Sequence, residues 1–311
     1  MAQLIKLQDY ISRYEVDVYR YPSQFMRLKK QQWNTFLQQE SDSQADTELS
    51  SLQEEEPLKH NKLAVFFQSL KKKPEIEEEL HVGKVVKSEE ELDEWELPKL
   101  VGAKTPEEKK QLFLNAILPL QLKWASSTIR EMSYLQKNYK RESTLLYFLQ
   151  RFPDTHLVMY RPIFLVKQAP VELEIILVTP TEIFAITYLE EENNSVVLGN
   201  NERFWAIRDK EKERKIVNPT ISLNRMASII KNILAYHEVD FPITKVLLHQ
   251  NGYIDITDGP SDIHVIDKRS YEPWFEKMRA NKLPLKHNQL KAAGVLLSHC
   301  QSTYVDRPEW K

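Results

Sequence analysis

The sequence has little cysteine and little glycine, and each shortage excludes a class of protein. Cys300 is the one cysteine among 311 residues, so the chain has neither a disulfide framework nor a cysteine cluster for zinc. Such cysteine usage is typical of a reducing, cytoplasmic setting. The chain contains six glycines. We therefore do not expect a phosphate-binding loop that needs several closely spaced glycines.

Long hydrophobic runs and a strong excess of one charge are also missing. Charges are scattered through the first 22 residues, "MAQLIKLQDYISRYEVDVYRYP", and no later apolar stretch is long enough for a membrane span. We therefore expect no signal peptide and no membrane partner. The net charge is −2 and the isoelectric point is about 6.5. The chain as a whole is therefore not basic enough to indicate nucleic-acid binding, which leaves a local basic patch open.

The near-neutral total conceals an acidic segment. Residues 40–99 contain 17 acidic residues and 8 lysines, a net charge of −9, which leaves +7 for the rest of the chain. We interpret residues 39–104 as an acidic, partly disordered linker, because the segment is polar and poor in aromatic residues. An apolar island, Asn61–Leu70 ("NKLAVFFQSL"), interrupts it. This island is either a short helix docked on the protein's own body or a motif for a protein partner.

Residues 1–38 are expected to form a helical N-terminal segment. Apolar side chains recur there at helical spacing: Leu4, Leu7, Ile11 and Tyr14. Pro22 interrupts the pattern, and Ser23 can cap a second short helix. The basic run that follows has a simple explanation as a solvated helix face.

Residues 105–139 are expected to form a helical lead-in to the main domain. Thr105-Pro106-Glu107-Glu108 places a cap residue, a proline at the first helical position and a glutamate three residues after the cap. Pro119 is expected to end or kink this helix. Apolar residues between Ile129 and Leu135 recur at three-residue spacing, which predicts a second helix.

After residue 140, strand signals alternate with helix signals. "ESTLLYFLQRFPD" reads as a helix, and "HLVMYRPIFLV", "LEIILVTP" and "EIFAITYL" read as short buried strands. Asn218-Pro219 opens another helix, with a cap and a proline at the first position. "ITKVLLH" and "IHVID" are further strands, and "YEPWFEKMRANKL" reads as a closing helix. This order predicts an α/β fold with a sheet flanked by helices, over residues 140–257 and a C-terminal extension, 258–311.

The order of these elements resembles that of the nuclease-related domain family, NERD. The family's fold is a variant of the restriction-endonuclease-like core, so the resemblance implies a mixed sheet of that type. Its pattern has an acid on the first helix, an acid on a core strand, a strand that ends in Glu-x-Lys, and a helix that opens with Asn-Pro and carries Gln three residues later. The corresponding positions of this sequence are Glu142, Glu174, Thr187, Leu189 and Ser222.

The departures from the pattern fall on the residues that handle a metal ion. Phosphodiester hydrolysis of this type uses Mg²⁺ or Mn²⁺ held by converging carboxylates. Glu174 supplies one carboxylate, but Thr187 is a poor ligand and Leu189 has no charge to offer. We therefore expect a catalytically degenerate pseudoenzyme without a metal or other cofactor. The alternative is a Mg²⁺- or Mn²⁺-dependent nuclease with an altered acid set that includes Glu174 and Glu142.

Such a domain is expected to bind DNA or RNA through the cleft that corresponds to the family's active site, or to bind a protein through the apolar island Asn61–Leu70. Other clusters have simpler explanations. Asp255, Asp258 and Asp262 surround a Gly-Pro turn but lack the spacing of a calcium-binding loop. The basic run from Arg203 to Lys215 is interleaved with acids, which favours a charged loop over a phosphate track.

Overall fold

The computed structural model describes residues 1–51, 105–209, 212–257, 261–281 and 283–307. The apolar island Asn61–Leu70 and the rest of the acidic segment beyond Ser51 lie outside the described residues. The chain divides into two compact units, one of residues 1–30 with 114–311 and one of residues 31–113. No helix within the described ranges is long and apolar enough to cross a membrane.

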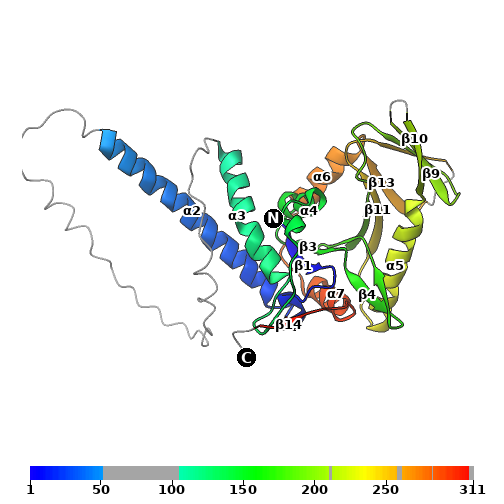
Figure 1. Cartoon of the computed structure of the whole chain (residues 1–311), viewed down its shortest axis with the longest axis horizontal. Coiled ribbons are helices and arrows are strands. Elements are labelled where there is room, and N and C mark those ends of the chain that lie inside the picture. The colour runs from blue at the N-terminus through cyan, green and yellow to red at the C-terminus, as the bar shows by residue number, and fades with distance from the viewer. Residues whose placement is uncertain (52–104, 210–211, 258–260, 282, 308–311) are drawn as a thin grey trace, which may run out of the picture. The chain divides into compact units, whose positions relative to one another are not determined.

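A six-stranded mixed sheet forms the centre of the first unit (Figure 1). Its strands, in spatial order, are β1 (Gln3–Leu7), β3 (Leu157–Tyr160), β6 (Ile175–Val178), β7 (Ile183–Tyr188), β11 (Ile243–His249) and β13 (Ile263–Asp267). Strands β3, β6 and β7 form an antiparallel meander, and β11 and β13 then run parallel to β7. The expected α/β fold with a mixed sheet flanked by helices is confirmed.

Helices α4 (Ser143–Arg151) and α5 (Pro219–Tyr236) cover opposite faces of this sheet. Neighbouring strand residues point to opposite faces. Tyr188 stacks on Tyr147 of α4, with ring centroids 5.9 Å apart, whereas Thr187 lines a cavity together with Ser222 of α5. The two helices therefore enclose the end of β7 between them.

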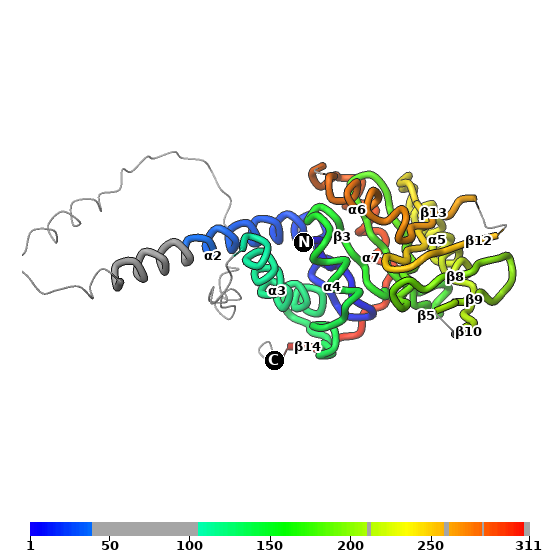
Figure 2. The backbone as a smooth tube through the Cα atoms, turned by 90° about the horizontal axis from the view of Figure 1, so that it is seen from above, coloured from blue at the N-terminus to red at the C-terminus, as the bar shows by residue number. Residues whose placement is uncertain are grey.

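A four-stranded sheet is built from two insertions. One insertion lies between β7 and α5 and supplies β8 (Val196–Gly199), β9 (Phe204–Asp209) and β10 (Lys212–Val217). The other follows β11 and supplies β12 (Tyr253–Ile256), which pairs parallel with β8. Figure 2 shows these strands side by side. The interpretation of the run from Arg203 to Lys215 as a charged loop is wrong in part. Much of the run forms strands, and β10 pairs along its whole length with β9.

Of the two short helices expected in residues 1–38, the first is wrong, and the second lies within the longer helix α2 (Tyr21–Ser51). The chain begins with strand β1, which pairs parallel with β3. All five of its residues are buried, and Lys6 is 0% exposed. A strand buried on both faces has no alternating pattern, so its apolar residues resembled a helical stripe. Helices α1 (Arg13–Val16) and α2 (Tyr21–Ser51) follow, and α2 extends well past the expected end of the segment.

The lead-in contains one α-helix instead of two. Helix α3 (Pro106–Trp124) starts as expected, since the Thr105 hydroxyl accepts from the Glu108 amide and the Glu108 carboxylate accepts from the Thr105 amide. It continues through Pro119 instead of ending there. The expected second helix is wrong: β2 (Glu131–Met132) pairs with β14 (Val305–Asp306), and the 3-10 helix η2 (Lys137–Lys140) follows.

The C-terminal extension contains one helix more than expected. Helix α6 (Tyr271–Ala280) is the expected one, and α7 (His287–Ser298) comes after it and packs against α5. After α7, the chain pairs at Cys300 with Phe164 of β4 (Ile163–Val166), whose hairpin partner is β5 (Ala169–Glu172). The residue pair Cys300–Phe164 therefore connects the segment after α7 to the β4–β5 hairpin.

Candidate functional site

The residues singled out from the sequence converge on one cleft. Glu174, Thr187, Leu189 and Ser222 all line a cavity of about 480 Å³ between the end of β7, strand β10 and the start of α5. Arg225, one turn further along α5, lines it as well. Four of the five positions named by the NERD resemblance thus share a cavity, and Glu142 is the exception.

Strand register and a helix cap bring these side chains together. Ile175 of β6 pairs with Ile186 of β7, so the next residues outward, Glu174 and Thr187, lie beside each other at the strand ends. Asn218 starts α5: its side-chain oxygen accepts from the backbone amide of Thr220 at 2.9 Å. The first turn of α5 then places Ser222 against the carboxylate of Glu174.

Glu174 is a half-buried acid with a neutral hydrogen-bond partner. The Ser222 hydroxyl donates to its Oε1 at 2.7 Å. Burial raises the pKa of Glu174, and the Ser222 and Thr187 hydroxyls together with Arg225 and Arg161 oppose that rise only in part. The buried Thr187 hydroxyl makes no hydrogen bond of good geometry with a described residue. The charged form of Glu174 is therefore disfavoured relative to a free glutamate.

This set of donors does not fit a Mg²⁺ or Mn²⁺ centre. Such ions take several oxygen ligands, of which carboxylates supply the negative charge. The cleft offers one carboxylate that disfavours its charge, a neutral threonine hydroxyl and a leucine. A second acid, Glu191, lines the same cavity but forms an ion pair with Arg214. Among the described residues, no group of three or more histidine, cysteine, aspartate or glutamate side chains is arranged to hold a metal.

Glu142 lies apart from this cleft. It is the residue before the first turn of α4, and its carboxylate accepts a hydrogen bond from the Tyr160 hydroxyl at 3.0 Å. This contact ties the start of α4 to the end of β3. Glu142 is not among the residues that line the cavity of Glu174, so the structure does not assemble the two acids of the altered set around one cavity.

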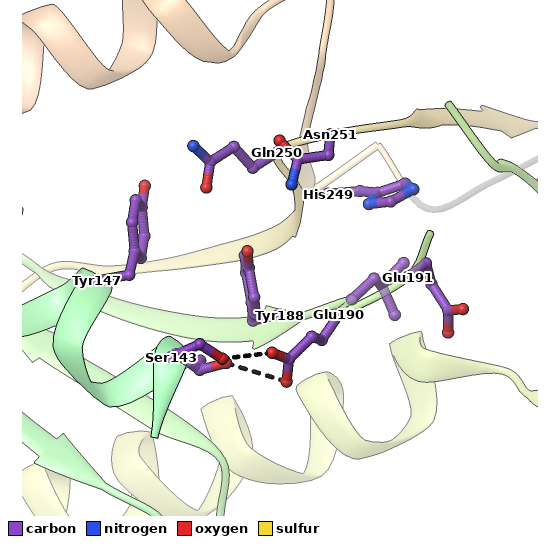
Figure 3. Close-up of a pocket in the computed structure, with 10 residues that line it drawn as sticks. Ser143, Tyr147, Tyr188, Glu190, Glu191, His249, Gln250 and Asn251 are labelled. Carbon is purple, nitrogen blue, oxygen red and sulfur yellow. Dashed lines mark hydrogen bonds between the residues drawn. The ribbon is translucent and has the colours of Figure 1, made fainter. Parts of the chain in front are cut away.

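A second, smaller cavity of about 240 Å³ opens on the α4 side of β7 (Figure 3). It shares Tyr188, Leu189 and Glu191 with the first cavity. Glu190 accepts hydrogen bonds from the hydroxyls of Ser143, at 2.7 Å, and Thr144, at 3.1 Å. The carboxylate of Glu190, just after β7, is therefore hydrogen-bonded to the start of α4 and does not join Glu174 in the first cavity. No sequence spacing signals this contact, because it joins residues 46 and 47 positions apart.

The side chains after β11 form the far wall of this second cavity. Figure 3 shows Gln250 and Asn251 beside the rings of Tyr147 and Tyr188. His249 is 1% exposed and its Nε2 lies 3.0 Å from the Ser195 hydroxyl. Burial lowers the pKa of His249. The ring is therefore neutral at pH 7, a buried histidine with a hydrogen-bond partner.

Other candidates from the sequence are engaged in ordinary contacts. Asp255 and Asp262 form ion pairs with Arg269 and Lys245, and Asp258 lies outside the described residues. The Cys300 thiol contacts the Leu296 carbonyl at 3.4 Å, and burial raises its pKa to about 12. It is thus an unreactive thiol at neutral pH.

Comparisons with known proteins give one short similarity. A segment of 33 residues, 11% of this chain, is 67% identical to part of an RNA 2',3'-cyclic phosphodiesterase from Geobacillus stearothermophilus. The matched segment is 10% of that protein's length. No protein-family model and no solved structure matches the chain.

Proposed function

We propose that this protein is a catalytically degenerate nuclease-related domain of the NERD type, with a restriction-endonuclease-like core, that binds nucleic acid without cutting it. A protein-binding role, through the apolar island Asn61–Leu70, is the outcome if nucleic acid does not bind. The proposal rests on the order of the elements, on the chemistry around Glu174 and on the charges that border the cleft.

The order of elements supports the family assignment. Helix α4, the meander β3, β6 and β7, helix α5 and the parallel strand β11 follow one another as the family pattern requires. Asn218-Pro219 opens α5, and Glu174 precedes β6 at the place of the strand acid. The insertion of β8–β10 and the N-terminal strand β1 are additions to that order.

The contact between Glu174 and Ser222 is the observation that carries the loss of catalysis. A carboxylate that holds a metal must be charged and turned toward the ion. Glu174 instead accepts a hydrogen bond from a neutral hydroxyl, and burial raises its pKa. Leu189 stands where the family pattern has a lysine, and it offers no charge or proton to an attacking water.

Basic side chains near the cleft favour nucleic acid as the ligand. Arg225 and Arg161 lie close enough to Glu174 to lower its pKa. Arg225 is exposed and forms no ion pair with a described residue, so it is available to a phosphate. Just before β9, Arg203 lies over the ring of Phe204, which is 49% exposed and can stack on an unpaired base.

A titration with matched charge reversals tests this role. Labelled single- and double-stranded DNA and RNA would be titrated with the full chain at low and moderate salt, with fluorescence anisotropy as the readout. We expect salt-dependent binding that weakens in Arg225→Glu. Lys231→Glu is the control, because it makes the same kind of charge change further along α5. No binding by the wild type at low salt would remove nucleic acid and leave the protein-binding role. Equal weakening by both variants would show that the cleft is not the binding site.

An active metal-dependent nuclease is the second candidate. One observation favours it: Glu191 lines the same cavity as Glu174. The pairing of Glu191 with Arg214 argues against it. Cleavage assays separate the two candidates.

A further inference from the structure

Two histidines from different helices meet on the surface of the first unit. His237 follows the last residue of α5, and His299 follows the last residue of α7. Their Nε2 atoms are 2.8 Å apart, so the rings share a hydrogen bond whose proton a bound metal ion would replace, and their ring planes cross at 78°. Helices α5 and α7 lie side by side in Figure 1 and Figure 2. The pair could not be predicted from sequence spacing, because the two residues are 62 positions apart.

The backbone holds both histidines in place. The amide of Glu238 donates to the Ala235 carbonyl at 3.2 Å, and the amide of Val239 donates to Leu234 at 2.9 Å. These bonds close the end of α5 in a left-handed turn, with Glu238 at φ 53°. The carbonyl of His299 accepts from the Leu165 amide of β4 at 2.9 Å. Little backbone freedom would be lost if a ligand fixed the two rings.

The surroundings of the pair favour a positive charge. Each helix carries roughly half a negative charge at its C-terminal end, from its unpaired carbonyl groups. The last turns of α5 and α7 contain no basic residue that would offset this charge. Two such ends meet at His237 and His299. A cation between the rings would be attracted by both helix ends.

The spacing of the two nitrogen atoms fits neighbouring positions on a metal ion. Metal–nitrogen bonds of about 2.0–2.1 Å place two ligands at a right angle about 2.9 Å apart, and two tetrahedral ligands about 3.4 Å apart. The observed 2.8 Å is close to the right-angle value. Right-angle positions occur in the tetragonal and square-planar sites of Cu²⁺ and Ni²⁺, which imidazole suits as a ligand.

We propose that His237 and His299 form a surface site for one divalent late-transition-metal ion, Cu²⁺ or Ni²⁺, bound through both Nε2 atoms. Water completes the coordination, since within the described ranges no third histidine, cysteine or carboxylate is placed to join. The Cys300 thiol, next in sequence, contacts the Leu296 carbonyl instead. A bound ion links the C-terminal ends of α5 and α7.

This site is independent of the Glu174 cleft. Glu174 meets α5 at its first turn, through Ser222, whereas His237 follows its last residue. Eighteen helical residues separate the two ends, a length of roughly 27 Å. Failure of the nucleic-acid proposal would therefore leave this proposal untouched, and the reverse also holds.

Titration of the full chain with Ni²⁺, followed by calorimetry, tests the proposal. We expect the wild type to bind one equivalent that both His237→Ala and His299→Ala weaken by at least about tenfold. His264→Ala is the matched control, because His264 is an exposed histidine on β13, and we expect it to bind like the wild type. Unchanged binding in both site variants, or no binding by the wild type, would overturn the proposal.

A spectroscopic measurement keeps the test valid if a variant fails to fold. The electron paramagnetic resonance spectrum of Cu²⁺ added in one equivalent to the wild type would be recorded, with the imidazole nitrogens counted from the nitrogen couplings. The proposal requires two nitrogens in the wild type and in His264→Ala. A spectrum with one imidazole nitrogen or none would contradict it.

Discussion

At the scale of single residues, the carboxylate of Glu174 lies among groups that bind a neutral or hydrogen-bonded acid better than a metal ion. Ser222 donates to it and burial raises its pKa, while Leu189, which lines the same cavity, carries no charge. The family resemblance located Glu174, Thr187 and Ser222 from sequence order alone. It could not show that Glu190 is bonded to Ser143 and Thr144, because that contact depends on how α4 packs against the end of β7.

Replacement of Glu174 by glutamine tests how much the charge of this half-buried acid costs in stability. Because the pKa of Glu174 is raised on folding, the protonated form favours the folded state, and its contribution is lost as pH rises past the ordinary range of a glutamate. Glu174→Gln keeps an acceptor for Ser222 and removes the charge. We expect it to raise the free energy of unfolding at pH 7 by on the order of 1 kcal/mol.

Urea denaturation at several pH values measures this effect. The gain should shrink below the ordinary glutamate pKa of 4.5, where the wild-type side chain is protonated as well. The exposed Glu276 on α6 is a suitable control site, and Glu276→Gln should change stability little at any pH. A destabilised Glu174→Gln at pH 7 would show that the charged carboxylate has a partner that this account lacks.

At the scale of elements, local sequence signals were sufficient to predict some helices and strands but not others. Asn218-Pro219 fixed the start of α5, and Thr105 fixed the start of α3, because a cap acts through its own neighbours. Strand β1 could not be predicted from local sequence. Its burial depends on β3, more than 150 residues away, and on partners of Lys6 elsewhere in the chain.

The cap of α5 is expected to hold one wall of the cleft. Asn218 is 6% exposed, accepts from the Thr220 amide and hydroxyl, and donates to the Glu202 carbonyl. Asn218→Ala removes all three bonds, so we expect a loss of about 2 kcal/mol in the free energy of unfolding. Hydrogen exchange should show faster opening in the first turn of α5.

Asn232→Ala provides the comparison on the same helix. Asn232 is exposed and lies beyond the first turn of α5, so this change should leave stability unchanged or slightly raised, since alanine favours helix. Equal stability of Asn218→Ala and the wild type would mean that the cap does not position Ser222.

At the scale of the whole molecule, the start of the chain completes the central sheet of the first unit. The Lys6 ammonium group donates to the Tyr10 carbonyl at 2.8 Å, to Glu15 at 2.6 Å and to Ser302 at 2.6 Å. This buried contact joins β1, the segment after it and the C-terminal segment. The contact could not be predicted from either terminal segment alone, because Lys6 and Ser302 are 296 positions apart.

Lys6→Met tests whether this junction stabilises the unit. Methionine has a similar length, but it leaves the Glu15 carboxylate without its buried cation, so we expect a loss of on the order of 3 kcal/mol. Lys291→Met is the control, because Lys291 is exposed on α7. Thermal and urea unfolding would both report the difference. A loss no greater than that of the control would contradict a structural role for Lys6.

The most direct test of the central claim is a cleavage assay with Mn²⁺. Labelled single- and double-stranded DNA and RNA would be incubated with the wild type and with Glu174→Ala, in Mn²⁺ or in EDTA, and resolved on a denaturing gel. The degenerate site predicts no Mn²⁺-dependent products from either protein. Cutting that requires Mn²⁺ and disappears in Glu174→Ala would contradict the account and establish an active nuclease with a rearranged acid set.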